Sequence, residues 1–346
     1  MQRQLRKRIR QSRKSIIILS AALVLITLTV LLLLLVFTTL RGNNSEKTQS
    51  VEFEYKEAAD TDMPPAPEPA GSYEDEATAK EWAGSEDSIA DQEEPEGPEI
   101  LEFVDAFGEK YETGIRDGVP RAPYSREAYS AGDDMKYSYE DDSYTSRLGI
   151  DVSHHQGRID WQAVKADGFD FAFIRLGYRG YGETGSVNLD KLFDENADNA
   201  RAAGLDVGVY FFAQAINEEE AKEEAEFVLK HLEGHDINLE VVYDPESILD
   251  AKARTDDVSG EQFTKNTQVF CSIISEAGYK PMVYSNMKWE AFQFDMTKLT
   301  DLPFWYADYE PIPQTPYDFR YWQYTNEGRA KGVSGAVDLN MEFIKK

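Results

Sequence analysis

Cysteine and histidine are scarce in this sequence of 346 residues, which argues against a disulfide-stabilised fold and against a histidine-based metal site. Cys271 is the single cysteine, so no disulfide can form within the chain. It falls on the apolar stripe of an expected helix, which predicts a core position. The histidines form two separate pairs, His154 with His155 in an expected loop and His231 with His235 at an expected helix end, so we expect no metal site. A glycine-rich phosphate loop is also missing, and we expect no cofactor.

Basic residues are few as well. There are 36 Lys and Arg against 64 Asp and Glu, which gives a formal net charge of -28. Residues 45–99 alone hold eighteen acids against three Lys, with proline-rich patches such as MPPAPEPAG. Such a segment has too little apolar surface to offset its ordering entropy, so residues 41–99 are predicted to be a disordered acidic spacer. The negative charge therefore indicates a well-solvated, extended spacer and carries no information about the substrate. Nucleic acid is not an expected partner of so acidic a chain.

The N-terminus reverses this pattern. Its first fourteen residues carry seven Lys or Arg, and residues 16–40 form an uncharged apolar stretch of 25 residues. A bilayer-spanning helix needs about 20 apolar residues, whereas the apolar region of a signal peptide has about 7 to 15. We therefore expect a basic cytoplasmic tail over residues 1–15 and an uncleaved single-pass transmembrane helix over 16–40. The positive-inside rule then predicts that the rest of the chain is extracytoplasmic at the cell membrane.

Residues 100–146 have a mixed composition. The stretch EFVDAFGEKYETGI, residues 102–115, is typical of a short hairpin or strand. The stretch YSREAYSAGDDMKYSYEDDSY, residues 124–144, has the composition of a linker.

Residues 147–346 alternate short β-type runs with helical ones, and this alternation predicts parallel strands joined by crossover helices. The expected helix after Asn217, which caps it, and the one after Ser259 carry the clearest apolar stripes. The last three β-type runs follow one another too closely for full helices between them. The sequence therefore predicts an irregular TIM-like (β/α)5(β)3 barrel. Its eight β-type runs are RLGIDVS, FDFAFIRLGY, DVGVYFFAQ, EVVYDPE, KPMVYSN, PFWYADY, FRYWQYT and GAVDLNMEF.

Acidic residues gather where these strands are expected to end. Asp151 ends the first run, Asp244 and Glu246 end the fourth, and Asp338 is placed late in the eighth. In a barrel of this kind the chemistry lies at the carboxyl ends of the strands, so the four acids are expected to share one rim. Side chains two apart on a strand face the same way, which makes Asp244 and Glu246 neighbours. Two close carboxyls hold one proton more tightly, as glycosidic bond cleavage requires.

A lone D-x-E triplet is more often a turn or a cap, but the surrounding residues resemble a known family. DVSHHQG at 151–157 is similar to the opening signature of the glycoside hydrolase family 25 lysozymes, which are N-acetylmuramidases. The resemblance runs in the family's order from residue 147 to the C-terminus. It includes FAFIRLGY, GVYFFAQA, VVYDPE, PMVYSN, FWYADY, YWQYT and GAVDLN.

The resemblance implies a glycoside hydrolase that cleaves the β-1,4 bond between N-acetylmuramic acid and N-acetylglucosamine in peptidoglycan. The family's acids map onto Asp244, Glu246, Asp151 and Asp338, with Glu246 as general acid. Asp244 then orients a substrate acetamido group, activates water or attacks directly; the first is the favoured hypothesis. Asp151 and Asp338 are expected to tune the protonation of the pair and to hydrogen-bond the sugar; the alternative is a structural role, since an Asp at a strand end often caps the next backbone N–H. Phe211 stands at a position where many family members have a histidine, and we interpret this difference as variation at the wall of the substrate groove.

Aromatic residues crowd the same strand ends, and aromatic platforms suit the apolar C–H faces of sugars. Any single one of them is more often a core residue. Within the family motifs, the expected substrate-binding residues are Tyr210, Trp305, Trp322, Tyr178, Asn286 and Tyr309. Arg175 is expected to be a buried partner of the acids.

Two functions remain in competition. The first is a membrane-anchored muramidase that remodels the cell wall, with peptidoglycan glycan strands as substrate. The second is a catalytically weak glycan-binding or scaffold protein at the wall. The complete set of acids favours the first.

Overall fold

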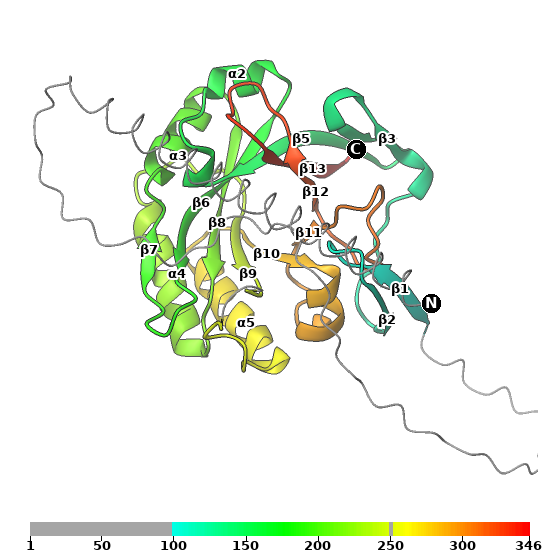
Figure 1. Ribbon diagram of the computed structural model, residues 1–346, viewed down its shortest axis with the longest axis vertical. Helices are drawn as coiled ribbons and strands as arrows, with labels where there is room; N and C mark the ends of the chain where they lie inside the picture. The colour runs from blue at the N-terminus through cyan, green and yellow to red at the C-terminus, as the bar shows by residue number, and fades with distance from the viewer. Residues whose placement is uncertain (1–98, 249–251) are drawn as a thin grey trace, which may run out of the picture. The chain divides into compact units, whose positions relative to one another are not determined.

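The computed structural model describes residues 99–248 and 252–346. Its centre is a closed eight-stranded barrel (Figure 1). The strands are β5 (Tyr144–Val152), β6 (Phe171–Arg179), β8 (Asp206–Ala213), β9 (Val241–Pro245), β10 (Pro281–Asn286), β11 (Phe304–Ala307), β12 (Tyr321–Gly328) and β13 (Val337–Lys345). The sheet closes because β5 pairs with β6 on one side and with β13 on the other. A short strand, β7 (Val187–Leu189), pairs antiparallel with β6 outside the barrel. The predicted α/β barrel is confirmed.

Helices cover one side of this barrel. They are α2 (Trp161–Ala166), α3 (Phe193–Ala202), α4 (Glu218–Leu232) and α5 (Gly260–Glu276). The expected caps are present: the side chain of Asn217 accepts from the N–H of Glu220, and that of Ser259 accepts from the N–H of Gln262. After β10 the crossover is reduced to one π-helical turn, Trp289–Gln293, and one 3-10 turn, Met296–Lys298. The β/α alternation therefore fades toward the C-terminus, as the sequence predicted.

The last strand runs the other way. β13 is antiparallel to both β12 and β5, and it brings Asp338 opposite Asp151 near its own beginning, not late in the strand as expected. Eight residues separate β12 from β13, which suits an antiparallel return, whereas a parallel crossover needs a dozen or more. Because β13 begins at the end of the barrel where the parallel strands finish, Asp338 still reaches the expected rim.

Residues 124–144, interpreted from sequence as linker, are folded. Strands β3 (Tyr129–Ala131) and β4 (Tyr137–Tyr139) form a hairpin, and Tyr139 is only 1% exposed. Upstream, β1 (Ile100–Val104) and β2 (Lys110–Gly114) form the hairpin that the sequence suggested. β5 also begins at Tyr144, three residues before the expected start of the barrel at 147.

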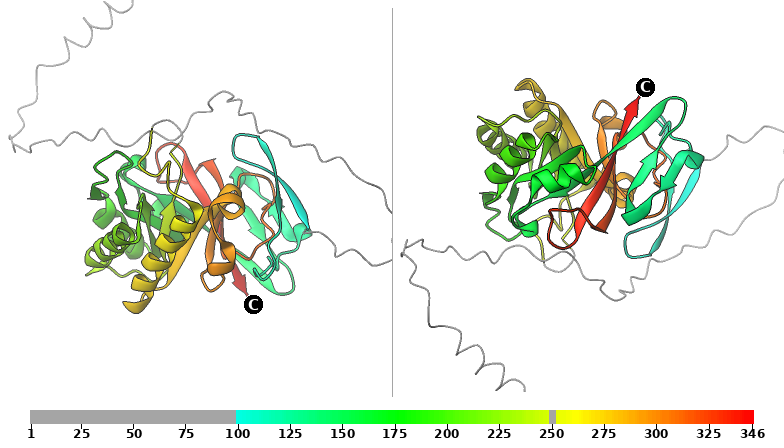
Figure 2. Two further views of the ribbon diagram at one scale, coloured as in Figure 1. Left: turned by 90° about the horizontal axis from the view of Figure 1, so that it is seen from below. Right: turned by 90° about the horizontal axis from the view of Figure 1, so that it is seen from above.

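This N-terminal part, residues 99–143, covers the barrel strands that have no helix over them. Tyr124 stacks on Phe343 with ring centroids 4.0 Å apart, and Tyr137 stacks on Tyr324 at 4.9 Å. Figure 2 shows it on the side of the barrel away from α3, α4 and α5. The outward faces of β12 and β13 are apolar and must be buried, so this segment takes the place of the missing helices.

The predicted cytoplasmic tail (1–15) and transmembrane helix (16–40) lie outside the described residues, as does the predicted spacer (41–99) apart from residue 99. Within 99–248 and 252–346, no helix is both long enough and apolar enough to cross a bilayer.

Candidate active site

The barrel interior is layered because side chains alternate along each strand. Its middle is apolar, with Phe171, Phe173, Val242, Met282, Trp305 and Tyr321 packed together. Above this layer, at the end where the parallel strands finish, lie the four predicted acids. Asp151 and Asp338 face each other across β5 and β13 and share a hydrogen bond, and Asp244 shares one with Glu246 beyond Pro245. The structure therefore brings the four acids to one rim.

Asp151 is held by neutral donors. Its Oδ2 accepts hydrogen bonds from Gln323 Nε2 at 2.9 Å and from Asn340 Nδ2 at 2.8 Å. Asn340 Oδ1 in turn accepts from Trp305 Nε1 at 2.8 Å, and Gln323 Oε1 accepts from the Tyr284 hydroxyl at 2.8 Å. These second contacts fix both amides so that their NH₂ groups point at the carboxylate. Burial raises the pKa of Asp151 to about 6, although the two amide hydrogen bonds lower it.

The charge of Asp151 acts on both carboxyls of the D-x-E pair, Asp244 and Glu246. Burial and then the charge of Asp151 raise the pKa of Glu246 to about 7. Burial, followed by the charges of Glu246 and Asp151, raises the pKa of Asp244 well above its usual range. Asp244 is 4% exposed and its Oδ1 has no hydrogen-bond partner within the described chain. The pair therefore holds a shared proton near neutral pH and leaves one carboxyl oxygen for a ligand.

Asp338 completes the acid group. Burial and the charge of Asp151 raise its pKa well above the ordinary carboxyl range. Protonated Asp338 can donate to the Asp151 carboxylate, which makes this second pair a store of one more proton beside the first.

Arg175 is the cation next to the acids. It is buried in the middle of β6, where its Nε and one terminal nitrogen lie 2.9 and 2.8 Å from Asp190 Oδ2. The same nitrogen lies 2.7 Å from His154 Nδ1. Its charge lowers the pKa of Asp244 against the burial that raises it. The expectation of a buried partner is met, but its direct ion pair is with Asp190, which the sequence reading missed.

The predicted substrate-binding aromatics lie at different depths. Tyr309 is 39% exposed at the rim, and Tyr210 is half-buried above the apolar layer. Tyr178 is half-buried beneath the guanidinium of Arg175, whose carbon lies 5.2 Å from its ring centroid. Trp305 is 1% exposed and stacks on Phe173, so it forms the floor beneath the acids and is not a groove surface.

Two of the predicted contacts have other roles. Trp322 is fully buried on the outside of the barrel, where it packs edge-on against Tyr129 and donates from Nε1 to the carbonyl of Asp308. It faces outward because Gln323, the next residue, faces inward. Asn286 caps the turn after β10, since its Oδ1 accepts from the N–H groups of Lys288 and Trp289.

Phe211 is likewise on the outer face of its strand. It is 1% exposed and packs against Phe227 of α4, so the departure from the family pattern lies under a helix and not at a groove wall. Neither pair of histidines is part of a metal cluster: within the described ranges, no group of three or more His, Cys, Asp or Glu side chains is arranged to hold a metal ion.

Sequence reasoning also missed the residue that fixes the main chain of Glu246. Gln214, which is 1% exposed, donates from Nε2 to the Glu246 carbonyl at 2.8 Å and accepts at Oε1 from the Thr255 hydroxyl at 3.0 Å. Arg254 donates to the Gln214 carbonyl at 3.0 Å and pairs with Glu220 at 2.6 Å. No periodic signal marks Gln214, because its partner is a backbone atom in a loop distant in the sequence, just after β9. Asn340, in contrast, lies two residues from Asp338 and could have been found by alternation, whereas the prediction of Trp322 as a substrate contact turned its neighbour Gln323 away from the site.

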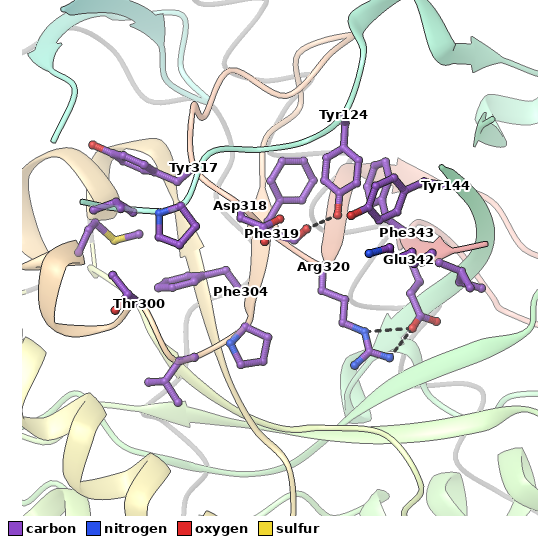
Figure 3. Close-up of a pocket in the computed structure, with 17 residues that line it drawn as sticks. Tyr124, Tyr144, Thr300, Phe304, Tyr317, Asp318, Phe319, Arg320, Glu342 and Phe343 are labelled. Carbon is purple, nitrogen blue, oxygen red and sulfur yellow. Dashed lines mark hydrogen bonds and ion pairs between the residues drawn. The ribbon is translucent and has the colours of Figure 1, made fainter. Parts of the chain in front are cut away.

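A cavity of about 430 Å³ lies at the other end of the barrel (Figure 3). It is lined by residues at the amino ends of β5, β11 and β12, among them Tyr144, Phe304 and Arg320. Arg320 forms ion pairs there with Glu240 at 2.6 Å and Glu342 at 2.8 Å. That end of an α/β barrel serves stability, so this cavity is separate from the candidate active site.

The family model for "Glycosyl hydrolases family 25" matches residues 150–333, which hold three of the four acids. The chain belongs to this glycoside hydrolase family. It is 27% identical over 194 residues to "Autolytic lysozyme" of Clostridium acetobutylicum, covering 56% of this chain and 54% of that protein. It is 28% identical over 210 residues to "Lysozyme M1" of Streptomyces globisporus, covering 56% and 66%. The chain thus spans about half the length of the first of these relatives.

The autolysin LytC of Streptococcus pneumoniae has a similar structure, with a TM-score of 0.52, 22% identity and coverage of 70% of this chain and 56% of that one. At this identity the similarity supports the fold alone. The family 25 barrel expected from the sequence is confirmed by the family match.

Proposed function

We propose that this chain is a lysozyme that hydrolyses the β-1,4 bond between N-acetylmuramic acid and N-acetylglucosamine in peptidoglycan. The observation that carries the proposal is the proton-sharing pair of Asp244 and Glu246 on the rim of a family 25 barrel. The printed names of two relatives, an autolytic lysozyme and a lysozyme, support it.

In the proposed mechanism, Glu246 donates its proton to the glycosidic oxygen as the bond from C1 to that oxygen breaks. The acetamido oxygen of the N-acetylmuramic acid unit attacks C1, and Asp244 accepts a hydrogen bond from the acetamido N–H. Water then opens the resulting ring, and Glu246 takes the proton back. This route is favoured over direct activation of water because Asp244 and Glu246 are in hydrogen-bond contact, whereas inverting enzymes keep their carboxyls about 6.5 to 9.5 Å apart.

The experiment is digestion of purified peptidoglycan by the full chain, dispersed in detergent, followed by turbidity and by mass spectrometry of the products. We expect fragments with N-acetylmuramic acid at the reducing end, and loss of nearly all cleavage in Glu246→Gln. Glu219→Gln is the matched control, because Glu219 is exposed on α4. Binding without cleavage, on wall material that a control lysozyme digests, would replace this proposal with a glycan-binding or scaffold role.

Membrane anchoring forms a second part of the proposal. It is supported by the 25 uncharged apolar residues of 16–40 and the seven basic residues before them. The test is protease treatment of intact cells without their wall, probed with an antibody to the barrel. Degradation of the barrel in a membrane-bound chain is expected, and protection of the barrel would contradict the orientation.

A further inference from the structure

The β1–β2 hairpin reaches the rim that carries the acids. Lys288 follows β10, and its Nζ lies 3.2 Å from Asp105 Oδ2 in the hairpin turn. Gln314 lies in the loop after β11, where its side chain accepts from the Val104 N–H and donates to the Val104 carbonyl, both at 2.8 Å. These loops leave the carboxyl ends of parallel strands, so the hairpin turn lies at the acid-bearing end of the barrel (Figure 1).

A continuous line of contacts joins this hairpin to the acids. Gln314 Nε2 lies 3.2 Å from the carboxylate of Asp308, which precedes Tyr309. The Tyr309 hydroxyl donates to Gln323 Oε1 at 3.3 Å, and Gln323 donates to Asp151 at 2.9 Å. The hairpin therefore borders the candidate groove on the β10–β11 side.

Exposed aromatic rings gather along the same border. Phe107 in the hairpin turn is 47% exposed, Phe292 after β10 is 48% exposed and Tyr309 is 39% exposed. They are three of the six well-exposed large hydrophobic side chains in the described part of the chain. The Phe292 ring packs against Phe103 and Tyr111 of the hairpin, with centroids 6.1 and 5.9 Å apart. Exposure of this kind, concentrated beside a site, marks a binding surface.

Two basic residues of this border are paired with acids. Lys288 is matched by Asp105, and Arg116 at the base of the hairpin lies 3.8 Å from Asp295. No basic side chain of this pair is free to bind the carboxylates of the wall's stem peptides, whereas the exposed aromatic rings suit the C–H faces of sugars.

We propose that the β1–β2 hairpin and Phe292 form an additional subsite that binds further sugars of the glycan strand beyond the cleaved bond. This inference rests on the proposed lysozyme function, and it specifies which part of the glycan strand the hairpin binds. Residues 100–114 lie outside the family match, which covers 150–333 and includes Phe292, so the hairpin adds to the family barrel a surface that the matched region does not contain.

The test uses Phe107→Ala and Phe292→Ala in the full chain. Cleavage is measured on long glycan strands freed of stem peptides and on a tetrasaccharide of the same repeat. Each variant should raise KM for long strands about three- to tenfold, the size expected for one lost aromatic platform, with kcat unchanged. The tetrasaccharide, which does not reach the hairpin, should be cleaved as by the wild type. Met135→Ala is the matched control, because Met135 is also exposed, at 42%, but lies beside the β3–β4 hairpin.

Binding separates the two proposals. Cosedimentation of each variant with long strands is measured in the Glu246→Gln background, where no cleavage is expected. Weaker binding in the two Phe variants supports the subsite even if the wild type proves unable to hydrolyse the strand. Unchanged KM and unchanged binding would overturn it, and so would an equal rise of KM on the tetrasaccharide, which would place these rings at the cleaved bond.

Discussion

Replacing Asp151 by Asn tests whether the rim acids act as one electrostatic unit. The amide oxygen of an Asn can take the place of Oδ2 and accept from Gln323 and Asn340, so the contacts survive while the charge is removed. That charge is the second cause, after burial, of the rise in the pKa of Glu246 to about 7. It also raises the pKa of Asp244. Its removal should therefore lower the pH at which the pair gives up its shared proton.

The expected size follows from the pKa of Glu246, which rises from an ordinary 4.5 to about 7. Burial is the larger cause, so for the charge of Asp151 we take the lower end of what a neighbouring charge contributes, about one pKa unit or ~1.4 kcal/mol. Activity that needs the proton of Glu246 should therefore be half-maximal near pH 7 in the wild type. A fall of one unit leaves about one tenth of the sites protonated at that pH, so activity relative to the acidic plateau should drop about fivefold.

The assay is the pH dependence of kcat/KM on solubilised glycan strands, supported by a carbon-13 NMR titration of the Glu246 carboxyl, which needs no turnover. Glu290→Gln is the control, because Glu290 is buried but contacts Ser285 and Thr315 and not the acids. If the alkaline limb and the NMR titration are both unmoved in Asp151→Asn, the charge of Asp151 does not act on the pair and the reasoning fails.

Three further outcomes are expected. Gln214→Ala should lower kcat at least tenfold with KM nearly constant, because it releases the main chain of Glu246. Steady-state kinetics on glycan strands measure both constants, and a rise in KM with kcat unchanged would refute this. Tyr139→Ala should cost about 3 to 5 kcal/mol of unfolding free energy in a denaturant titration, and Tyr139→Phe about 1, whereas no loss would show that the β3–β4 hairpin is not part of the core. Burial raises the pKa of Glu290 to about 7, so its contribution to stability should be lost as pH rises from 4.5 to 7, by on the order of 3 kcal/mol, and Glu290→Gln should make the fall in stability over this range smaller by about that amount, a prediction that equal slopes in the two proteins would refute.

The sequence predicted the parts of the fold that rest on local pattern. Alternation of strand and helix, the caps at Asn217 and Ser259, and the fading of helices after β10 are all readable from neighbouring residues. The position of the four acids on one rim could also be predicted, because the carboxyl ends of the parallel strands of a barrel lie at the same rim. The reversal of β13 did not follow, since strand direction depends on pairing across the sheet and leaves no mark on its own side chains.

Residues 124–144 show why the rest was hidden. Their Tyr, Ser, Asp and Lys residues follow no helical or strand period, and this pattern predicted a linker. In the structure, however, their tyrosines pack on Trp322, Tyr324 and Phe343. The partners lie about two hundred residues further along the chain. Trp322 was misassigned for the same reason: with its cover unrecognised, an aromatic on a strand near the rim looked available to substrate.

The reversed final strand also decides where the folded chain can be attached to something else. β13 carries the C-terminus away from the acids, and the N–H of Lys346 bonds to the carbonyl of Ser143 at 2.9 Å. Glu99, where the described chain begins, lies at the base of the β1–β2 hairpin next to Arg121 and far along it from the turn at the rim. An affinity tag, a fluorescent label or an immobilising linker joined at either point would therefore leave the groove open to an insoluble polymer in front of it.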